Sequence, residues 1–221
     1  MDDFEPKVAV KICGLTSVAD ALACADAGAD WMGLNFSPRS VRCLTPTLGA
    51  EIIAAVRPRF PRIKFAGVFV DQDRELVRQI ATDLALEAVQ LHGNETVEDV
   101  DATRGLMIIK ALRVGAELPD VGTFAEHCDA ILLDTWSATA PGGTGETFPW
   151  EMAAALRPQI KRLILAGGLT SENVSEAIHA VHPFAVDVCS GVEREPGKKD
   201  ERKMRNFIAA VRAAERGGTR P

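Results

Sequence analysis

The chain has 221 residues, of which 47% are hydrophobic and 25% charged, so it has enough apolar material for one large domain or two small ones. Its net charge of −6 argues against nucleic acid as a partner, because binding to phosphate backbones needs a surplus of Lys and Arg. The acidic start Met1–Glu5 does not resemble a signal peptide, and no apolar run is long enough to cross a membrane. The five scattered cysteines fit reduced thiols. We therefore expect a cytoplasmic protein without a membrane partner.

Short apolar runs alternate with helix-like segments along the whole chain. The runs are continuous rather than alternating, as expected for strands buried on both faces of a parallel sheet. The predicted strands are Val8–Ile12, Trp31–Phe36, Lys64–Val70, Ala88–His92, Met107–Leu112, Ala130–Asp134, Leu163–Ala166 and Phe184–Val188.

The segments between these runs have helical patterns. One apolar stripe is formed by Leu76, Val77, Ile80 and Leu84, and a second by Met204, Phe207, Ile208 and Val211. Ser17 with Asp20 resembles a capping box, and Pro158 and Pro183 mark helix ends.

Eight strand–helix units without a linker predict a single (β/α)₈ barrel, an α/β fold, over residues 1–221, with a frayed tail at 216–221. An open doubly wound sheet is the alternative. That fold is expected to carry GxGxxG after its first strand, and the residues Cys13-Gly14-Leu15-Thr16 do not match it.

In such a barrel the reactive groups lie where the strands end, because the eight variable loops converge there. Gly167-Gly168 follows the seventh strand, before a helix that Thr170 or Ser171 can cap, and Ser190-Gly191 follows the eighth. Loops at these two positions commonly bind phosphate through backbone N–H groups. The alternative is that these glycines only serve tight turns.

The long connection from Thr135 to Thr147 contains Pro141-Gly142-Gly143 and Gly145. It is either a lid that excludes water during a reaction or an ordinary surface loop.

Seven stretches together resemble the phosphoribosylanthranilate isomerase family. They are KICGLT at 11–16, GLNFSPRSVR at 33–42, GVFVD at 67–71, VQLHGNE at 89–95, LLDT with GGTGETFPW within 132–150, LAGGLTSENV at 165–174 and AVDVCSGVEREPGKKD at 185–200. They occur in the family's order through nearly the whole chain.

The resemblance implies a cofactor-free (β/α)₈ barrel that performs an Amadori rearrangement on N-(5′-phosphoribosyl)anthranilate in tryptophan biosynthesis. It implies that Cys13 is the general base, Asp134 the general acid and Arg42 the ligand of the anthranilate carboxylate. It also implies that the loops Gly167-Gly168 and Ser190-Gly191 bind the phosphate. Val41 and Cys189 depart from the family pattern, which usually has Lys or Pro at the first position and Ser at the second.

Several residues keep two interpretations at this stage. His92 either orients a catalytic group at the mouth or is a structural histidine, and Asp187 either bonds a ribose hydroxyl or braces the barrel end. Lys11 assists a Cys13 thiolate only if it points into the mouth. The other cysteines, Cys24, Cys43 and Cys128, are expected to be structural, and the four histidines show no metal-ligand spacing.

We therefore expect an isomerase acting on a phosphorylated small molecule, without metal or cofactor, and a monomer because no long exposed apolar stripe stands out. Enzymatic alternatives are a histidine-pathway isomerase, which is expected to have an aspartate in place of Cys13, and indole-glycerol-phosphate synthase, which needs a lysine and glutamate set. A barrel that binds ligand without catalysis is the alternative outside enzymes.

Overall fold

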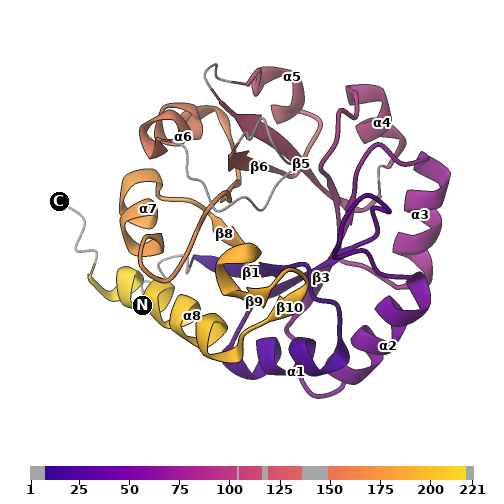
Figure 1. Ribbon diagram of the computed structural model, residues 1–221. Coiled ribbons are helices and arrows are strands. Elements are labelled where there is room, and N and C mark those ends of the chain that lie inside the picture. The colour runs from indigo at the N-terminus through magenta and orange to yellow at the C-terminus, as the bar shows by residue number, and fades with distance from the viewer. Residues whose placement is uncertain (1–7, 104, 116–118, 136–148, 218–221) are drawn as a thin grey trace, which may run out of the picture.

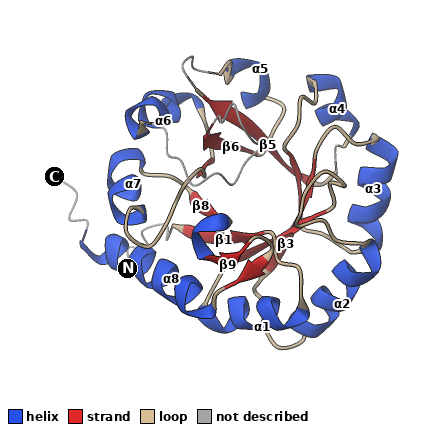
Figure 2. Cartoon of the chain, viewed as in Figure 1, coloured by secondary structure: helices blue, strands red, loops and turns tan. Residues whose placement is uncertain are grey.

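The computed structural model describes residues 8–103, 105–115, 119–135 and 149–217. Its centre is a closed barrel of eight parallel strands in sequence order, with β1 hydrogen-bonded to both β2 and β8. Helices surround the strands on the outside (Figures 1 and 2). The strands are β1 (Ala9–Cys13), β2 (Trp31–Asn35), β3 (Lys64–Phe69), β4 (Ala88–Leu91), β5 (Met107–Val114), β6 (Ala130–Thr135), β7 (Leu163–Leu165) and β8 (Ala185–Val188).

The predicted (β/α)₈ barrel is thus confirmed, and closure between β1 and β8 excludes the open doubly wound sheet. The helices are α1 (Val18–Ala27), α2 (Pro46–Val56), α3 (Arg74–Asp83), α4 (Val97–Ala102), α5 (Gly122–Ala125), α6 (Trp150–Leu156), α7 (Val174–Val181) and α8 (Glu201–Gly217). No helix among the described residues is long and apolar enough to cross a membrane.

Each strand is buried on both faces because one face fills the barrel and the other packs on the helices. The barrel interior contains many small side chains, which leaves room for a few large ones. Its buried members are Trp31, Ala66, Ala88, Ile109, Ala111, Ala130, Leu132, Ile164, Ala166 and Ala185. The larger cluster between strands and helices includes the predicted stripe of α8, and its Met204, Phe207, Ile208 and Val211 are all buried.

Three local predictions need correction. In α3, Val77, Ile80 and Leu84 are buried, but Leu76 is 46% exposed and is not part of the apolar stripe. At the start of α1, Ser17 Oγ accepts from Asp20 N as predicted, but the Asp20 carboxylate accepts from Lys199 N and does not complete the capping box. The expected tail begins too early, because α8 continues through Arg216 to Gly217; residues 218–221 lie outside the described part.

The segment between β8 and α8 forms additional structure at the barrel mouth. A short 3₁₀ helix, η2 (Ser190–Val192), leads into an antiparallel pair, β9 (Glu193–Glu195) and β10 (Lys198–Lys199). This hairpin brings Glu193 and Lys199 within hydrogen-bond distance of each other, with the Nζ–Oε1 distance at 2.9 Å. Both side chains are buried beside the strand ends.

Candidate active site

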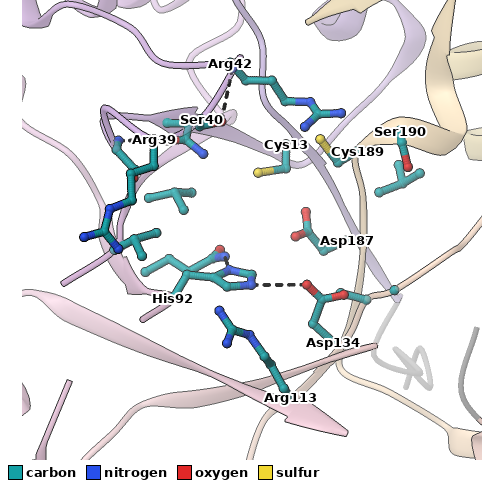
Figure 3. Close-up of a pocket in the computed structure, with 18 of the residues that line it drawn as sticks. Cys13, Arg39, Ser40, Arg42, His92, Arg113, Asp134, Asp187, Cys189 and Ser190 are labelled. Carbon is teal, nitrogen blue, oxygen red and sulfur yellow. Dashed lines mark hydrogen bonds and ion pairs between the residues drawn. The ribbon is translucent and has the colours of Figure 1, made fainter. Parts of the chain in front are cut away.

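A cavity of about 500 Å³ opens at the carboxyl ends of the barrel strands (Figure 3). Its lining comes from β1, β2, β3, β4, β5, β6, β7 and β8 or the loops that follow them. The structure places all the candidate site residues from the sequence on this cavity: Cys13, Arg42, His92, Asp134, Gly167, Gly168, Asp187, Ser190 and Gly191.

Cys13 is the last residue of β1, and its thiol is buried at the cavity wall. Space for the sulfur exists because position 33 on the neighbouring strand is glycine: a β-carbon there would lie 2.8 Å from Cys13 Sγ. A hydrogen bond with the Cys189 thiol, assisted by the charges of Lys11 and Lys199, holds the pKa of Cys13 well below its ordinary value despite burial. Cys13 is therefore suited to accept a proton near neutral pH.

Cys189 is the proton-holding partner of this thiol pair. It follows β8, one residue beyond the register pair Ile12↔Val188, so barrel closure brings it beside Cys13. The hydrogen bond with Cys13 and burial together raise the pKa of Cys189 well above the ordinary thiol value. Cys189, noted above as a departure from the pattern that the sequence resembles, thus supplies a thiol donor to Cys13.

Lys11 and Asp187 form a buried ion pair beneath the cavity, with Lys11 Nζ 2.9 Å from Asp187 Oδ1. Burial disfavours the ammonium, but the neighbouring carboxylate raises the pKa of Lys11 above its ordinary value. Burial raises the pKa of Asp187 to about 6, so both groups are charged at neutral pH. Lys11 is only 2% exposed and does not line the mouth; its effect on Cys13 is through its charge.

Asp187 fits both of its sequence interpretations. It braces the barrel end through Lys11, and it also lines the cavity beside Cys13 and Asp134 (Figure 3). Lys11 bonds Oδ1 only, which leaves Oδ2 able to accept from a ligand.

Asp134 is the last residue of β6 whose side chain faces the cavity, and it is 8% exposed. His92 Nε2 lies 3.1 Å from Asp134 Oδ2, and His92 Nδ1 lies 2.8 Å from Gln90 Nε2. With the Gln90 amide donating to Nδ1, the histidine proton is on Nε2 and points at Asp134. His92 is therefore in contact with the candidate acid and fixes its orientation.

Arg42 lines the cavity, but much of its guanidinium is already bound. Nε and Nη2 donate to the two carboxylate oxygens of Glu193 at 2.8 and 2.7 Å, and Glu193 is also held by the buried Lys199. The Glu193 bonds raise the pKa of Arg42, which remains a cation. Among the described residues no other side chain bonds the fork, so its outer edge around Nη1 is left for a ligand.

The two glycine-containing loops present backbone amides to the cavity. Gly167 and Gly168 have φ values of +87° and +62°, and in the described part of the chain the N–H groups of Gly167, Gly168, Ser190 and Gly191 donate to no protein acceptor. Unpaired backbone amides at a cavity wall can form an oxyanion-binding site, here called the phosphate seat. The expected cap was wrong: α7 begins at Val174 after Asn173, and Thr170 Oγ1 instead accepts from Glu172 N within the loop.

Several polar residues of this wall were not among the predicted site residues, including Asn35, Arg39 and Arg113. Arg113 had a usable signal: Ile109 and Ala111 face the barrel interior, and the period of two along a strand puts residue 113 on the same face. The predicted strand ended at Leu112, whereas β5 continues to Val114.

The remaining cysteines lie away from the cavity. Cys24 is fully buried in α1, where burial raises its pKa to about 12, and Cys128 packs partly buried against the core. Cys43 is exposed, and its backbone forms an isolated bridge with Asn35. The connection interpreted as either a lid or an ordinary surface loop lies mostly at 136–148, outside the described residues. No group of three or more His, Cys, Asp or Glu among those described is arranged to hold a metal ion.

Comparison with known proteins gives a consistent result. Residues 10–210 match the family described as N-(5′phosphoribosyl)anthranilate (PRA) isomerase. The N-(5′-phosphoribosyl)anthranilate isomerase of Pelobacter propionicus is 43% identical over 96% of this chain and 100% of its own length, and that of Aquifex aeolicus is 44% identical over 93% and 99%.

Solved structures agree. The phosphoribosyl anthranilate isomerase of Thermotoga maritima is 39% identical with a TM-score of 0.86, covering 93% of this chain and 99% of its own. An isomerase in complex with reduced 1-(o-carboxyphenylamino)-1-deoxyribulose 5-phosphate is 37% identical with a TM-score of 0.83 and the same coverage.

Proposed function

The chain belongs to the N-(5′-phosphoribosyl)anthranilate isomerase family, and on that premise we propose that Cys13 and Asp134 carry out the proton transfers of its reaction. The enzyme is an isomerase of tryptophan biosynthesis that converts N-(5′-phosphoribosyl)anthranilate to 1-(2-carboxyphenylamino)-1-deoxyribulose 5-phosphate. The observation that carries the proposal is that a thiol and a carboxyl group from different strands face one cavity (Figure 3). The wall of this cavity also offers backbone amides that donate to no acceptor among the described residues.

The first step opens the ribose ring. Asp134, in its acid form, donates its proton to the ring oxygen while the bond from C1′ to that oxygen breaks. The anthranilate nitrogen supplies its electron pair, and a protonated imine forms at C1′. His92, 3.1 Å from Asp134 Oδ2, keeps the carboxyl group directed at the cavity.

The second step removes the proton from C2′. The Cys13 thiolate takes this proton, and the C–H electron pair forms the C1′–C2′ double bond of an enolamine. Cys189 and the charges of Lys11 and Lys199 support the thiolate that performs this step. The Cys13 thiol exchanges its proton with solvent and then protonates C1′, while the Asp134 carboxylate takes the 2′-hydroxyl proton. These transfers give the ketone and restore the two catalytic groups.

Binding groups surround these two. We place the phosphate on the amides of Gly167, Gly168, Ser190 and Gly191, because they are unpaired among the described residues and lie on the loops after β7 and β8. We place a ribose hydroxyl on Asp187 Oδ2. The outer edge of Arg42 faces the cavity and is positioned by Glu193 to pair with the substrate carboxylate.

A fluorescence assay that follows the loss of phosphoribosylanthranilate tests the assignment. Cys13→Ala and Asp134→Asn are each expected to lower kcat by about 10²- to 10⁴-fold, the usual contribution of one positioned proton transfer. Cys24→Ala is the control, because that thiol is buried in α1 away from the cavity. Wild-type kcat in Cys13→Ala would refute its role as the base.

We also propose that the protein is a monomer of the cytoplasm. Support comes from the large exposed apolar side chains of the described part, Val41, Leu76 and Phe184, which lie on separate segments of the chain. The Thermotoga maritima relative is dimeric, so light scattering of the purified protein is informative. A dimer mass at micromolar concentration would refute the first half of this proposal, and fractionation of cell extracts tests the second.

A further inference from the structure

Arg113, the residue before the last of β5, lies where the inward-facing side chains of this strand reach the cavity. Below it, Ile109 and Ala111 fill the barrel interior. Arg113 is in register with Asp134 on β6, so the two residues are neighbours on the same rim. Figure 3 shows the Arg113 guanidinium directed into the cavity beside His92 and Asp134.

Arg113 differs from Arg42 in how its charge is used. Arg42 gives two N–H groups to Glu193, whereas Arg113 makes no hydrogen bond or ion pair with any residue of the described chain. It is exposed in the open cavity, and the described residues accept from none of its five N–H groups, so that part of the chain leaves them to a ligand. A free guanidinium fork matches the geometry of a carboxylate.

The order of strands around the barrel indicates which part of the substrate reaches it. The phosphate seat is at β7 and β8, the acid is on β6 and the base is on β1. The ribose therefore lies near β6, β8 and β1, and the aromatic ring must extend toward the opposite half of the rim, formed by β2 to β5. Arg113 stands at the β5 edge of that half, two strands away from β7.

We propose that Arg113 is a substrate-binding residue that pairs with the carboxylate of the anthranilate ring and selects for it. This inference rests on the proposed function. The Arg42 guanidinium lies beside Cys13 and Cys189, where it is bound to Glu193 and keeps only its outer edge free of the described residues, so in the β2–β5 half of the rim Arg113 supplies the complete fork (Figure 3).

The test compares two substrates that differ only in the carboxylate. N-(5′-phosphoribosyl)anthranilate and N-(5′-phosphoribosyl)aniline, made by condensing aniline with ribose 5-phosphate, are given to the wild type, Arg113→Gln and Arg113→Lys, and the products are separated by chromatography. The mutant-to-wild-type ratio of kcat/KM is taken for each substrate separately, so the different intrinsic reactivities of the two amines cancel.

Arg113→Gln is expected to lower kcat/KM for the carboxylated substrate by about 10- to 100-fold, the loss typical of a charge-assisted hydrogen-bonded pair, mainly through KM. For the aniline substrate the expected change is less than about 2-fold, since no partner is lost. Arg113→Lys is expected to fall between wild type and Arg113→Gln, because an ammonium keeps the charge but not the fork. A thermal melt checks that the variants fold.

Arg39 provides the matched comparison, because it is also an exposed arginine on this rim. Equal losses on both substrates in Arg113→Gln, or no loss on either, would overturn the inference while leaving an active wild type and the proposed function intact. A carboxylate-selective loss in Arg39→Gln without one in Arg113→Gln would overturn it as well. A wild type that converts neither substrate would refute the proposed function and this inference together.

Discussion

Replacing Gly191 with alanine tests the phosphate seat, because this residue is where the loops after β7 and β8 touch. A β-carbon at position 191 would lie 2.0 Å from Leu169 O, 3.1 Å from Leu169 C and 3.2 Å from Val188 Cγ2. The nearest atom belongs to the backbone and cannot rotate away as a flexible side chain would. The two loops must therefore separate.

The size of the effect follows from that distance. To restore a normal carbon–oxygen contact the loops must move apart by roughly 1 Å, and a misplacement of about 1 Å can cost ~10²-fold in rate. Overpacking of this kind costs about 1–3 kcal/mol of stability. For a domain of this size that lowers Tm by about 2–12 °C.

The assay measures kcat/KM and the inhibition constant of inorganic phosphate, which occupies the anion seat without the rest of the substrate. Gly191→Ala is expected to lower kcat/KM by about 10²-fold and to weaken phosphate inhibition at least about tenfold. Gly122→Ala is the matched control, since the added carbon there meets only Asp120 Oδ1 at 3.4 Å. A lower Tm in Gly191→Ala with an unchanged phosphate inhibition constant would refute the assignment of these loops.

Two further predictions follow from the charges of buried groups. The pKa of Cys13 is well below the ordinary thiol value, and the pKa of Cys43 is above it. The rate of alkylation by iodoacetamide, followed by mass spectrometry, should therefore level off at a lower pH for Cys13 than for the exposed Cys43. Parallel pH profiles for the two thiols would contradict the thiolate assignment. Lys110→Met should lower the free energy of unfolding by about 3–5 kcal/mol, because it strands the buried carboxylate of Glu95, whose Oε2 lies 2.7 Å from Lys110 Nζ. Lys110→Met/Glu95→Gln should regain part of this loss in chemical denaturation, and a double variant as unstable as the single one would contradict the explanation.

The barrel was predictable because its strands are determined by local pattern. Runs such as Ala130–Asp134 are apolar on both faces, and only a parallel sheet covered by helices buries both. Strand ends were predicted to within two residues, and the error at β5 mattered, because ending the strand at Leu112 hid the inward orientation of Arg113.

The candidate site was predictable only as a set of positions. Cys13, Asp134 and the glycine loops follow strands, so their convergence on one rim is a consequence of the fold. Contacts made across the closed barrel carry no local signal. Arg42 and Glu193 are 151 residues apart, and no periodicity indicates that they pair.

Competition between nearby partners explains the local errors. The carboxylate of Asp20 was expected to cap α1, but the chain that returns from β10 offers it the N–H of Lys199. Thr170 or Ser171 was expected to cap α7, but the Thr170 hydroxyl accepts from Glu172 N inside the loop that carries amides of the proposed phosphate seat. The backbone N–H that takes the predicted cap's oxygen belongs to a residue 2 positions away for Thr170 and 179 positions away for Asp20.

The most direct test of the mechanism uses substrate carrying deuterium at C2′ and measures release of that deuterium to solvent in a single turnover. The wild type should release it at the rate of product formation. Cys13→Ala should release it about 10²- to 10⁴-fold more slowly while inorganic phosphate still binds with its wild-type inhibition constant. Release at the wild-type rate from Cys13→Ala would show that another group removes the C2′ proton, and would contradict the account.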